Sequence, residues 1–246
     1  ELYGVDSMGE TAENLAEMYN ISKNDQDKFA AWSQQKAAIA ISSGRLAEEI
    51  VSVEITQKKG DAIVFNKDEF AKPSTNIETL SKLKPAFKKD GSVTAGNASG
   101  LNDGAAAILL ATEDAIKKYN LRPLARIISS GIAGVEPRIM GIGPVKASEK
   151  ALQRAGIKIN DIDVIELNEA FAAQVLACTR NMGIADDDAR LNINGGAIAL
   201  GHPLGMSGTR ITYSAALELQ KNNKRYALAT MCIGVGQGYA IVLEKV

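Results

Sequence analysis

The chain has 246 residues, and its 28 Lys and Arg residues nearly balance 29 Asp and Glu residues, which gives a formal charge of −1. This balance argues against nucleic-acid binding and against a polybasic membrane-surface protein, because both need a basic surface. The apolar share of 46% supports a folded core, and no run of about 18 apolar residues is present to span a bilayer. Two distant cysteines and one histidine exclude a disulfide framework and a Cys/His zinc site. We therefore expect no metal, no membrane, no nucleic acid, and a reducing, cytoplasmic compartment.

The chain begins with Glu1 and enters a helical pattern almost at once, as a piece of a longer protein would. Tag removal or processing would give the same start. Residues 1–14 lack the basic and apolar regions of a signal peptide.

The first part of the chain predicts two helices within residues 9–43. Ser22, with Asp25 three residues later, is typical of a helix start, and Gly44 is a plausible C-terminal cap for the same helix. Alternating apolar residues at 50–56 then predict a half-buried strand.

Residues 57–90 are rich in lysine and acidic residues and are broken by two prolines. This composition favours a solvated surface segment, with a lysine-bearing lobe for a phosphorylated ligand as the alternative. From residue 101 onward, apolar strands alternate with helices, which predicts an α/β fold with a buried sheet. The predicted strands cover 105–112, 125–134, 163–167, 226–234 and 239–246, and the predicted helices cover 113–119, 148–156, 168–183 and 207–220.

The densest feature is the glycine-rich segment 192–208, which surrounds the only histidine, His202, and opens a helix near Ser207. Glycines at this density allow close approach to a ligand, and the N–H groups at a helix start favour an anion. The segment is not a P-loop, because no Gly-Lys-Ser/Thr follows. A structural and a catalytic role for His202 are equally open from the residues alone.

Two further residues stand at strand ends. Cys232 precedes a glycine turn and is either a buried structural cysteine or a thiolate base or nucleophile. Asn168 follows the predicted strand 163–167 and is either a helix N-cap or an amide that orients a water or an oxyanion. Cys178 lies on the apolar body of the next helix and is expected in the core. The small-residue loop within 92–107 is a weaker signal for a flat ligand.

Together these motifs resemble the thiolase family. The matching segments are NEAFA at 168–172, NGGAIALGHPLGMSG at 194–208, CIGVGQG at 232–238, SVTAGNASGLNDGAAA at 92–107 and SMGETAENLAEMYNIS at 7–22. MCIGVGQG and PRIMGIGPV (137–145) resemble the degradative, 3-oxoadipyl-CoA branch. The resemblance covers essentially the whole chain. It implies an acyl-CoA C-acyltransferase that cleaves or forms 3-oxoacyl-CoA, built as the layered α/β/α/β/α thiolase fold.

The resemblance also implies a role for each matching residue. His202 would be the base that takes the proton from a nucleophilic cysteine. Cys232 would be the second acid/base, acting on the α-proton of acetyl-CoA in synthesis and on the thiol of CoA in thiolysis. Asn168 would hold a water that forms one oxyanion hole with His202, and the backbone N–H of Gly234 would contribute to the other.

The matching positions near the pantetheine of CoA are Ser99, Met140 and Phe171, and Lys72 matches a position near the nucleotide phosphates. Acyl-CoA and CoA are thus expected as substrates, and no cofactor is expected. The family implies a homodimer or homotetramer.

One departure from the family pattern matters most. The nucleophilic cysteine of thiolases lies in an earlier half of the family sequence and matches no residue here, and Cys178 is on the wrong motif to replace it. We therefore expect the chain alone to be inactive. Ser7 stands where many relatives have histidine, just before Met8, which bears on substrate preference.

The resemblance divides the chain into a CoA-binding loop domain (1–100), the end of the N-terminal thiolase repeat (101–121) and the C-terminal repeat (122–246). The isolated piece of the first repeat is expected to leave apolar surface exposed. Two alternatives remain: a CoA-binding or interaction module without catalysis, and a condensing enzyme of the 3-oxoacyl synthase type. The second is disfavoured, because such sites usually need another His or Asn where this chain has Cys232.

Overall fold

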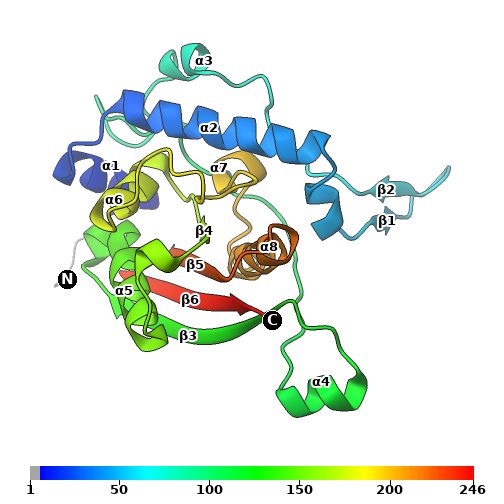
Figure 1. The fold of residues 1–246 in the computed structure, drawn as a ribbon. Helices are drawn as coiled ribbons and strands as arrows, with labels where there is room; N and C mark the ends of the chain where they lie inside the picture. The colour runs from blue at the N-terminus through cyan, green and yellow to red at the C-terminus, as the bar shows by residue number, and fades with distance from the viewer. Residues whose placement is uncertain (1–5) are drawn as a thin grey trace.

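The computed structural model describes residues 6–246, so Glu1 lies outside the described part. Its centre is a four-stranded mixed sheet in the order β3 (Ala125–Gly134), β6 (Gln237–Lys245), β5 (Tyr226–Ile233) and β4 (Val164–Leu167) (Figure 1). The β4 and β5 strands are parallel, and the other two pairs are antiparallel. The sequence pattern predicted these four strands, because each is a short apolar run bounded by turn residues.

Two helices cover the two faces of this sheet. Ile165 and Leu228 belong to the core cluster under α5 (Gly143–Ala155), whereas Val164 and Ala227 belong to the cluster under α8 (Ser207–Lys221). Neighbouring residues of a strand point to opposite faces, so α5 and α8 lie on opposite sides. The α5 helix packs tightly on β3: a Cβ at Gly131 would lie 2.1 Å from the carbonyl oxygen of Ala147.

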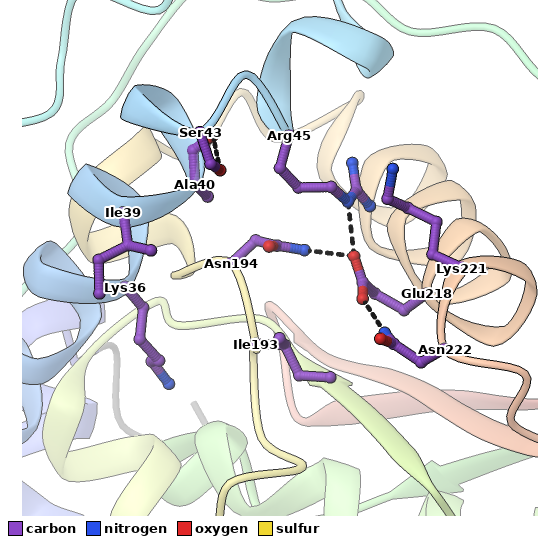
Figure 2. Close-up of a pocket in the computed structure, with 10 residues that line it drawn as sticks. All are labelled: Lys36, Ile39, Ala40, Ser43, Arg45, Ile193, Asn194, Glu218, Lys221 and Asn222. Carbon is purple, nitrogen blue, oxygen red and sulfur yellow. Dashed lines mark hydrogen bonds and ion pairs between the residues drawn. The ribbon is translucent and has the colours of Figure 1, made fainter.

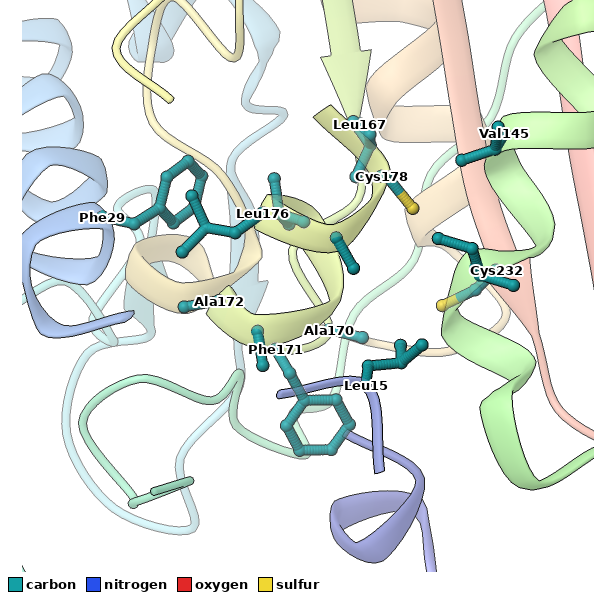
Figure 3. Close-up of a cluster of buried hydrophobic side chains, with 14 of the residues drawn as sticks. Leu15, Phe29, Val145, Leu167, Ala170, Phe171, Ala172, Leu176, Cys178 and Cys232 are labelled. Carbon is teal, nitrogen blue, oxygen red and sulfur yellow. The ribbon is translucent and has the colours of Figure 1, made fainter. Parts of the chain in front are cut away.

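A further layer covers the α5 side of the sheet. It consists of α1 (Met8–Met18), α2 (Lys23–Ser42) and α6 (Ala172–Asn181), and α6 contacts each of the other two helices (Figure 1). The side chain of Ser22 caps α2 by accepting from the backbone N–H of Asp25, and Gly44 follows its end with φ of +79°. Both predictions about this helix are confirmed. The apolar contact between the layers includes Leu15, Phe29 and Leu176 (Figure 3).

The remaining elements are short. They are η1 (Leu46–Glu49), β1 (Val53–Ile55), β2 (Ile63–Phe65), α3 (Ile77–Ser81), α4 (Glu113–Tyr119), η2 (Pro137–Ile142), η3 (Ile159–Asp161) and α7 (Ala197–Leu200). The hairpin of β1 and β2 and the α4 helix project from the body of the molecule (Figure 1). Most of 57–90 is exposed, in agreement with the predicted surface segment. Within the described residues, no helix combines the length and apolar character needed to cross a membrane.

Two predicted strands differ from the structure. The half-buried strand expected at 50–56 is reduced to Val53–Ile55, and all three residues are exposed, because β2 pairs with this strand but no layer covers it. The buried strand expected at 105–112 is absent: the segment has no regular structure, and Leu109 and Leu110 are 78% and 70% exposed. A strand needs a partner for its backbone hydrogen bonds, and none of the described strands pairs with this segment.

Candidate functional site

Asn168 lies where the parallel strands β4 and β5 end. Its backbone N–H donates to the carbonyl of Thr230 at 3.0 Å, so the parallel hydrogen bonding between β4 and β5 continues one residue beyond β4. Its side chain is fully buried, and Nδ2 lies 3.3 Å from Nε2 of His202. Asn168 does not cap the next helix, because α6 begins at Ala172 and Phe171 occupies the cap position. The capping interpretation of Asn168 is therefore wrong, and the predicted helix start at 168 moves to Ala172.

His202 follows the one-turn helix α7 and is held by its backbone. Its N–H donates to the carbonyl of Gly100 at 3.1 Å and lies 3.3 Å from Oδ1 of Asn102. The preceding Gly201 has φ of +92°, and a Cβ there would lie 2.4 Å from Oδ1 of Asn102, so this approach requires glycine. The glycine-rich segment thus places the backbone of His202 against the loop that precedes residue 105.

The second ring nitrogen of His202 faces Ser207, the first residue of α8. Oγ of Ser207 lies 2.6 Å from Nδ1 and donates its own proton to the carbonyl of Pro203 at 3.1 Å. The Ser207 oxygen must then accept from an Nδ1–H group, which leaves Nε2 as the unprotonated nitrogen beside Asn168. Burial, followed by the charge of Arg210, lowers the pKa of His202. The ring is therefore a neutral base at neutral pH.

Sequence reasoning missed this contribution of Ser207. The sequence pattern indicates Ser207 only as a helix start. The available signal was its position five residues after His202, at the first turn of a helix that follows a glycine loop.

Cys232 lies near the end of β5, in the core cluster on the α5 side, and is 6% exposed. Burial raises the pKa of its thiol to about 12, so the group is protonated at neutral pH. Gly234 lies in the turn between β5 and β6, next to Val235, whose φ is +68°. No hydrogen bond between described residues joins Cys232 to Asn168 or His202. The structure brings Asn168 and His202 into contact and leaves Cys232 and Gly234 on the adjacent strand end.

The other cysteine has a structural environment. Cys178 is fully buried in α6, and its S–H donates to the carbonyl of Gly141 at 3.2 Å. Its sulfur and that of Cys232 lie in the same apolar cluster (Figure 3). Cys178 is a core residue, as predicted.

Of the residues expected near CoA, Ser99 and Phe171 lie on paired segments. The N–H of Ser99 donates to the carbonyl of Ala170 at 3.0 Å, directly beside the bridge between Ala98 and Phe171. Phe171 packs edge-on against Phe87, with ring centroids 6.0 Å apart. Met140, in η2, is buried in the same apolar cluster as Phe171.

Lys72 is an exposed residue of the 57–90 segment. Its backbone N–H donates to Oε1 of Gln34 at 2.9 Å, and its Nζ lies 5.6 Å from the ring centroid of Phe70. No hydrogen bond or cation–π contact between described residues joins its ammonium group to Ser99, Met140 or Phe171.

A cavity of about 310 Å³ lies away from the residues expected to carry chemistry, between α2, α8 and the segment at 193–194 (Figure 2). Glu218 lies in its wall and binds Arg45 and Asn194. Lys36 also lines it, and burial lowers the pKa of this lysine to about 8. None of the predicted site residues lines the cavity.

Comparisons with known proteins identify the family of the chain. The family model described as "Thiolase, N-terminal domain" matches residues 1–114, and "Thiolase, C-terminal domain" matches residues 121–245. The beta-ketoadipyl-CoA thiolase of Acinetobacter baylyi is 56% identical over 245 residues, which are 100% of this chain and 61% of the relative. The 3-oxoadipyl-CoA/3-oxo-5,6-dehydrosuberyl-CoA thiolase of Escherichia coli K12 is 57% identical over 244 residues, 99% of this chain and 61% of the relative.

Solved structures give the same answer for the fold. The acetyl-CoA acetyltransferase of Bacillus anthracis superposes with a TM-score of 0.94 at 45% identity, over 98% of this chain and 60% of that one. Human mitochondrial 3-ketoacyl-CoA thiolase in complex with CoA superposes with a TM-score of 0.91 at 48% identity, over 97% of this chain and 59% of that one. The chain spans about 61% of the length of the curated relatives. The predicted thiolase fold is confirmed, and the chain belongs to the thiolase family.

Proposed function

We propose that this chain contributes the acid/base and oxyanion residues of an acyl-CoA C-acyltransferase, a thiolase that cleaves or forms 3-oxoacyl-CoA. The observation that carries the proposal is the contact between Nδ2 of Asn168 and Nε2 of His202, with Ser207 on the other ring nitrogen. This arrangement leaves Nε2 as the basic nitrogen, in a buried setting that keeps the imidazole neutral. A neutral, oriented imidazole is suited to deprotonate a thiol nucleophile.

In this proposal the nucleophilic cysteine comes from the part of the relatives' length that this chain does not span. Neither cysteine of the chain fits the role, since Cys178 is packed inside α6 and Cys232 is assigned another step. The nucleophile's proton passes to His202, and the thiolate attacks the 3-oxo carbonyl of the substrate. The bond between C2 and C3 then breaks, leaving an acyl-cysteine and the enolate of acetyl-CoA.

Cys232 is proposed to protonate that enolate. Burial raises the pKa of the thiol to about 12, so it carries a proton to donate at neutral pH. The resulting thiolate then takes the proton from the thiol of CoA, and the CoA sulfur attacks the acyl-cysteine. The new acyl-CoA forms as the nucleophilic cysteine leaves as a thiolate, which recovers its proton from His202. In synthesis the same thiolate removes the α-proton of acetyl-CoA.

The developing oxyanions need preorganised donors. We assign one set to protonated His202 together with a water held by Asn168, and the other to the backbone N–H of Gly234. Ser99, Met140 and Phe171 are proposed to lie along the pantetheine, with Lys72 toward the phosphates. The supporting observations are the adjacency of Ser99 to the Asn168 segment and the likeness to a thiolase solved with CoA.

The substrate class and the assembly are also proposals. Relatives named beta-ketoadipyl-CoA thiolase, at 56% and 57% identity, favour a 3-oxoacyl-CoA with a second carboxylate, such as 3-oxoadipyl-CoA. The complete enzyme is proposed to be a cytoplasmic homodimer or homotetramer that binds acyl-CoA and CoA.

The test joins this chain to the N-terminal segment of the Acinetobacter relative and measures thiolysis of acetoacetyl-CoA and 3-oxoadipyl-CoA. We expect activity, and a loss on the order of 10²–10⁴-fold for His202→Ala and for Cys232→Ala, because general acid–base groups contribute about that much. Full activity in either variant would remove that residue from the mechanism. The 246-residue chain alone should show no turnover, and measurable thiolysis by it would contradict the assignment of the nucleophile.

A further inference from the structure

Glu169 follows Asn168 directly, and the proposed chemistry does not use it. Its carboxyl group is fully buried and accepts hydrogen bonds from three parts of the chain. Oε2 accepts from Oγ of Ser33 on α2 at 2.7 Å and from the N–H of Ile198 on α7 at 3.1 Å. Oε1 accepts from Nδ2 of Asn192 at 2.8 Å. All of these partners are donors, so the carboxyl group acts only as an acceptor.

Two of these partners extend the connection. Asn192 also binds both backbone groups of Leu167, accepting from its N–H at 2.8 Å and donating to its carbonyl at 2.9 Å. Ser33 also accepts from the N–H of Gly196 at 3.1 Å. A Cβ at Gly196 would lie 2.2 Å from the Glu169 carboxyl carbon, so this backbone lies directly against the carboxyl group.

The network therefore joins the end of β4 to the glycine-rich segment on both sides of its turn. Asn168 lies one residue before Glu169, and His202 lies two residues after the end of α7, the helix that Glu169 holds through Ile198. The separation of Asn168 and His202 is thus set by the segments that meet at Glu169. Buried polar networks with every partner satisfied fix one arrangement of the chain.

We propose that Glu169 is a positioning residue, which keeps Asn168 and His202 in contact by tying the strand end to the loop that carries the histidine. The importance of this contact for catalysis rests on the proposed function. The contact itself is a property of the fold and is measurable without any enzymatic reaction.

The chain offers a matched control in Glu218, a second buried carboxyl group that binds the same glycine-rich segment. Oε1 of Glu218 accepts from Nε of Arg45 at 2.6 Å and from Nδ2 of Asn194 at 2.7 Å, and Oε2 accepts from Nδ2 of Asn222 at 2.6 Å (Figure 2). This group joins the segment to α8 and to Arg45, the residue before η1, rather than to the end of β4. Its loss should destabilise the fold without separating Asn168 from His202.

The experiment uses the fact that His202 is the only histidine among the 246 residues. The imidazole of the chain is titrated by NMR in the parent protein and in Glu169→Gln, Ser33→Ala and Glu218→Gln. Burial and Arg210 shift the pKa of His202, and Glu169 is not among the causes, so loss of the carboxylate by itself would leave that pKa unchanged. Separation of the ring from Asn168 admits water and raises the pKa, since burial is the main cause of its depression. A rise in the pKa of His202 therefore reports the separation of the ring from Asn168, and an unchanged value reports only the loss of a charge.

We expect the pKa of His202 to rise in Glu169→Gln and in Ser33→Ala, and to stay unchanged in Glu218→Gln. Ser33→Ala retains the carboxyl group, so it decides the question even if Glu169→Gln does not fold. An unchanged or lower value in Ser33→Ala, or an equal rise in Glu218→Gln, would overturn the positioning role. If the joined enzyme shows no thiolysis but the titrations give the expected shifts, the proposed function is wrong and the positioning role still holds.

Discussion

Oγ of Ser207 lies 2.6 Å from Nδ1 of His202 and points its own proton at the carbonyl of Pro203. The contact thereby assigns one tautomer to the imidazole, with the lone pair of Nε2 on the side of Asn168. The first turn of α8 thus has an additional function, because it positions a hydroxyl group that fixes the state of the base.

Replacement of Ser207 by alanine should disturb that state. The Nδ1–H group would lose its partner, and an unpaired buried donor costs about 1–3 kcal/mol. If the full cost appears in the barrier, kcat of the joined enzyme falls by about 5- to 150-fold. The ¹⁵N shifts of the two ring nitrogens, measured in the chain alone, should show a mixture of tautomers in place of a single one.

Ser214→Ala is the matched control for this variant. Ser214 is also on α8, and its hydroxyl donates to Oε2 of Glu49 at 2.6 Å, away from His202. This variant should leave the ring shifts unchanged. An unchanged tautomer in Ser207→Ala would show that the hydroxyl does not set it.

Local sequence signals predicted the elements well where the chain itself determines them. Ser22 and Gly44 bound α2, and Gly156 caps α5 with φ of +70°, because capping depends on residues within one turn. The range predicted for β3, 125–134, agrees with Ala125–Gly134, since alternation and flanking turns determine it. The family motifs also located His202 and Asn168.

The sequence predictions that fail depend on contacts between residues far apart in the chain. Asn168 is a good N-cap residue by type, but its side chain turns to a histidine 34 residues away, and no local pattern reports this. The segment 105–112 has the composition of a buried strand yet pairs with no described strand. Glu169 likewise binds Ser33, which lies 136 residues away in the sequence, so no local pattern indicates this contact.

The thiol of Cys232 should react slowly with iodoacetamide in the folded chain. Burial raises its pKa to about 12, and the thiolate is the reactive form. We expect alkylation at pH 7 to be at least about tenfold slower than for free cysteine, whose pKa is about 8.5, and to accelerate in urea. Mass spectrometry of digested protein measures the rate at this site.

The Cys232→Ala variant measures how much alkylation occurs at the second thiol, because only Cys178 remains in it. Cys178 is fully buried and should be even less reactive in the folded state. Modification of Cys232 at the rate of free cysteine at pH 7 would contradict its burial.

Glu166 should make the stability of the fold depend on pH. The side chain is fully buried, and burial raises its pKa from 4.5 to about 8, although Nη1 of Arg210 lies 4.0 Å away. Between pH 4.5 and about 8, Glu166 keeps its proton in the folded state and releases it in the unfolded state. The free energy of unfolding should therefore fall as pH rises through this window, by up to about 1.4 kcal/mol per unit of pKa difference.

Glu166→Gln removes this titration. The decrease of the free energy of unfolding with pH, between pH 5 and about 8, should therefore be smaller in this variant. Urea unfolding at several pH values measures the slope. The measurement stops near pH 8, because the depressed pKa of Lys36 gives stability that increases with pH above that point. Glu78→Gln, at an exposed carboxyl of α3, should retain the parent slope. An identical slope in Glu166→Gln would show that this carboxyl group does not retain its proton in the folded state.

The packing of α5 on the sheet is testable with two glycines of the same strand. A Cβ at Gly131 would lie 2.1 Å from the carbonyl oxygen of Ala147 and 2.8 Å from the backbone nitrogen of Ala151, whereas a Cβ at Gly134 would meet nothing within 4 Å. Gly131→Ala should therefore push α5 away from β3 and lower the free energy of unfolding by about 1–3 kcal/mol or more. Gly134→Ala should change it by less than about 1 kcal/mol, because the methyl group enters open space. Urea unfolding of the two variants measures the difference, and equal stabilities would show that α5 does not pack on β3 through Gly131.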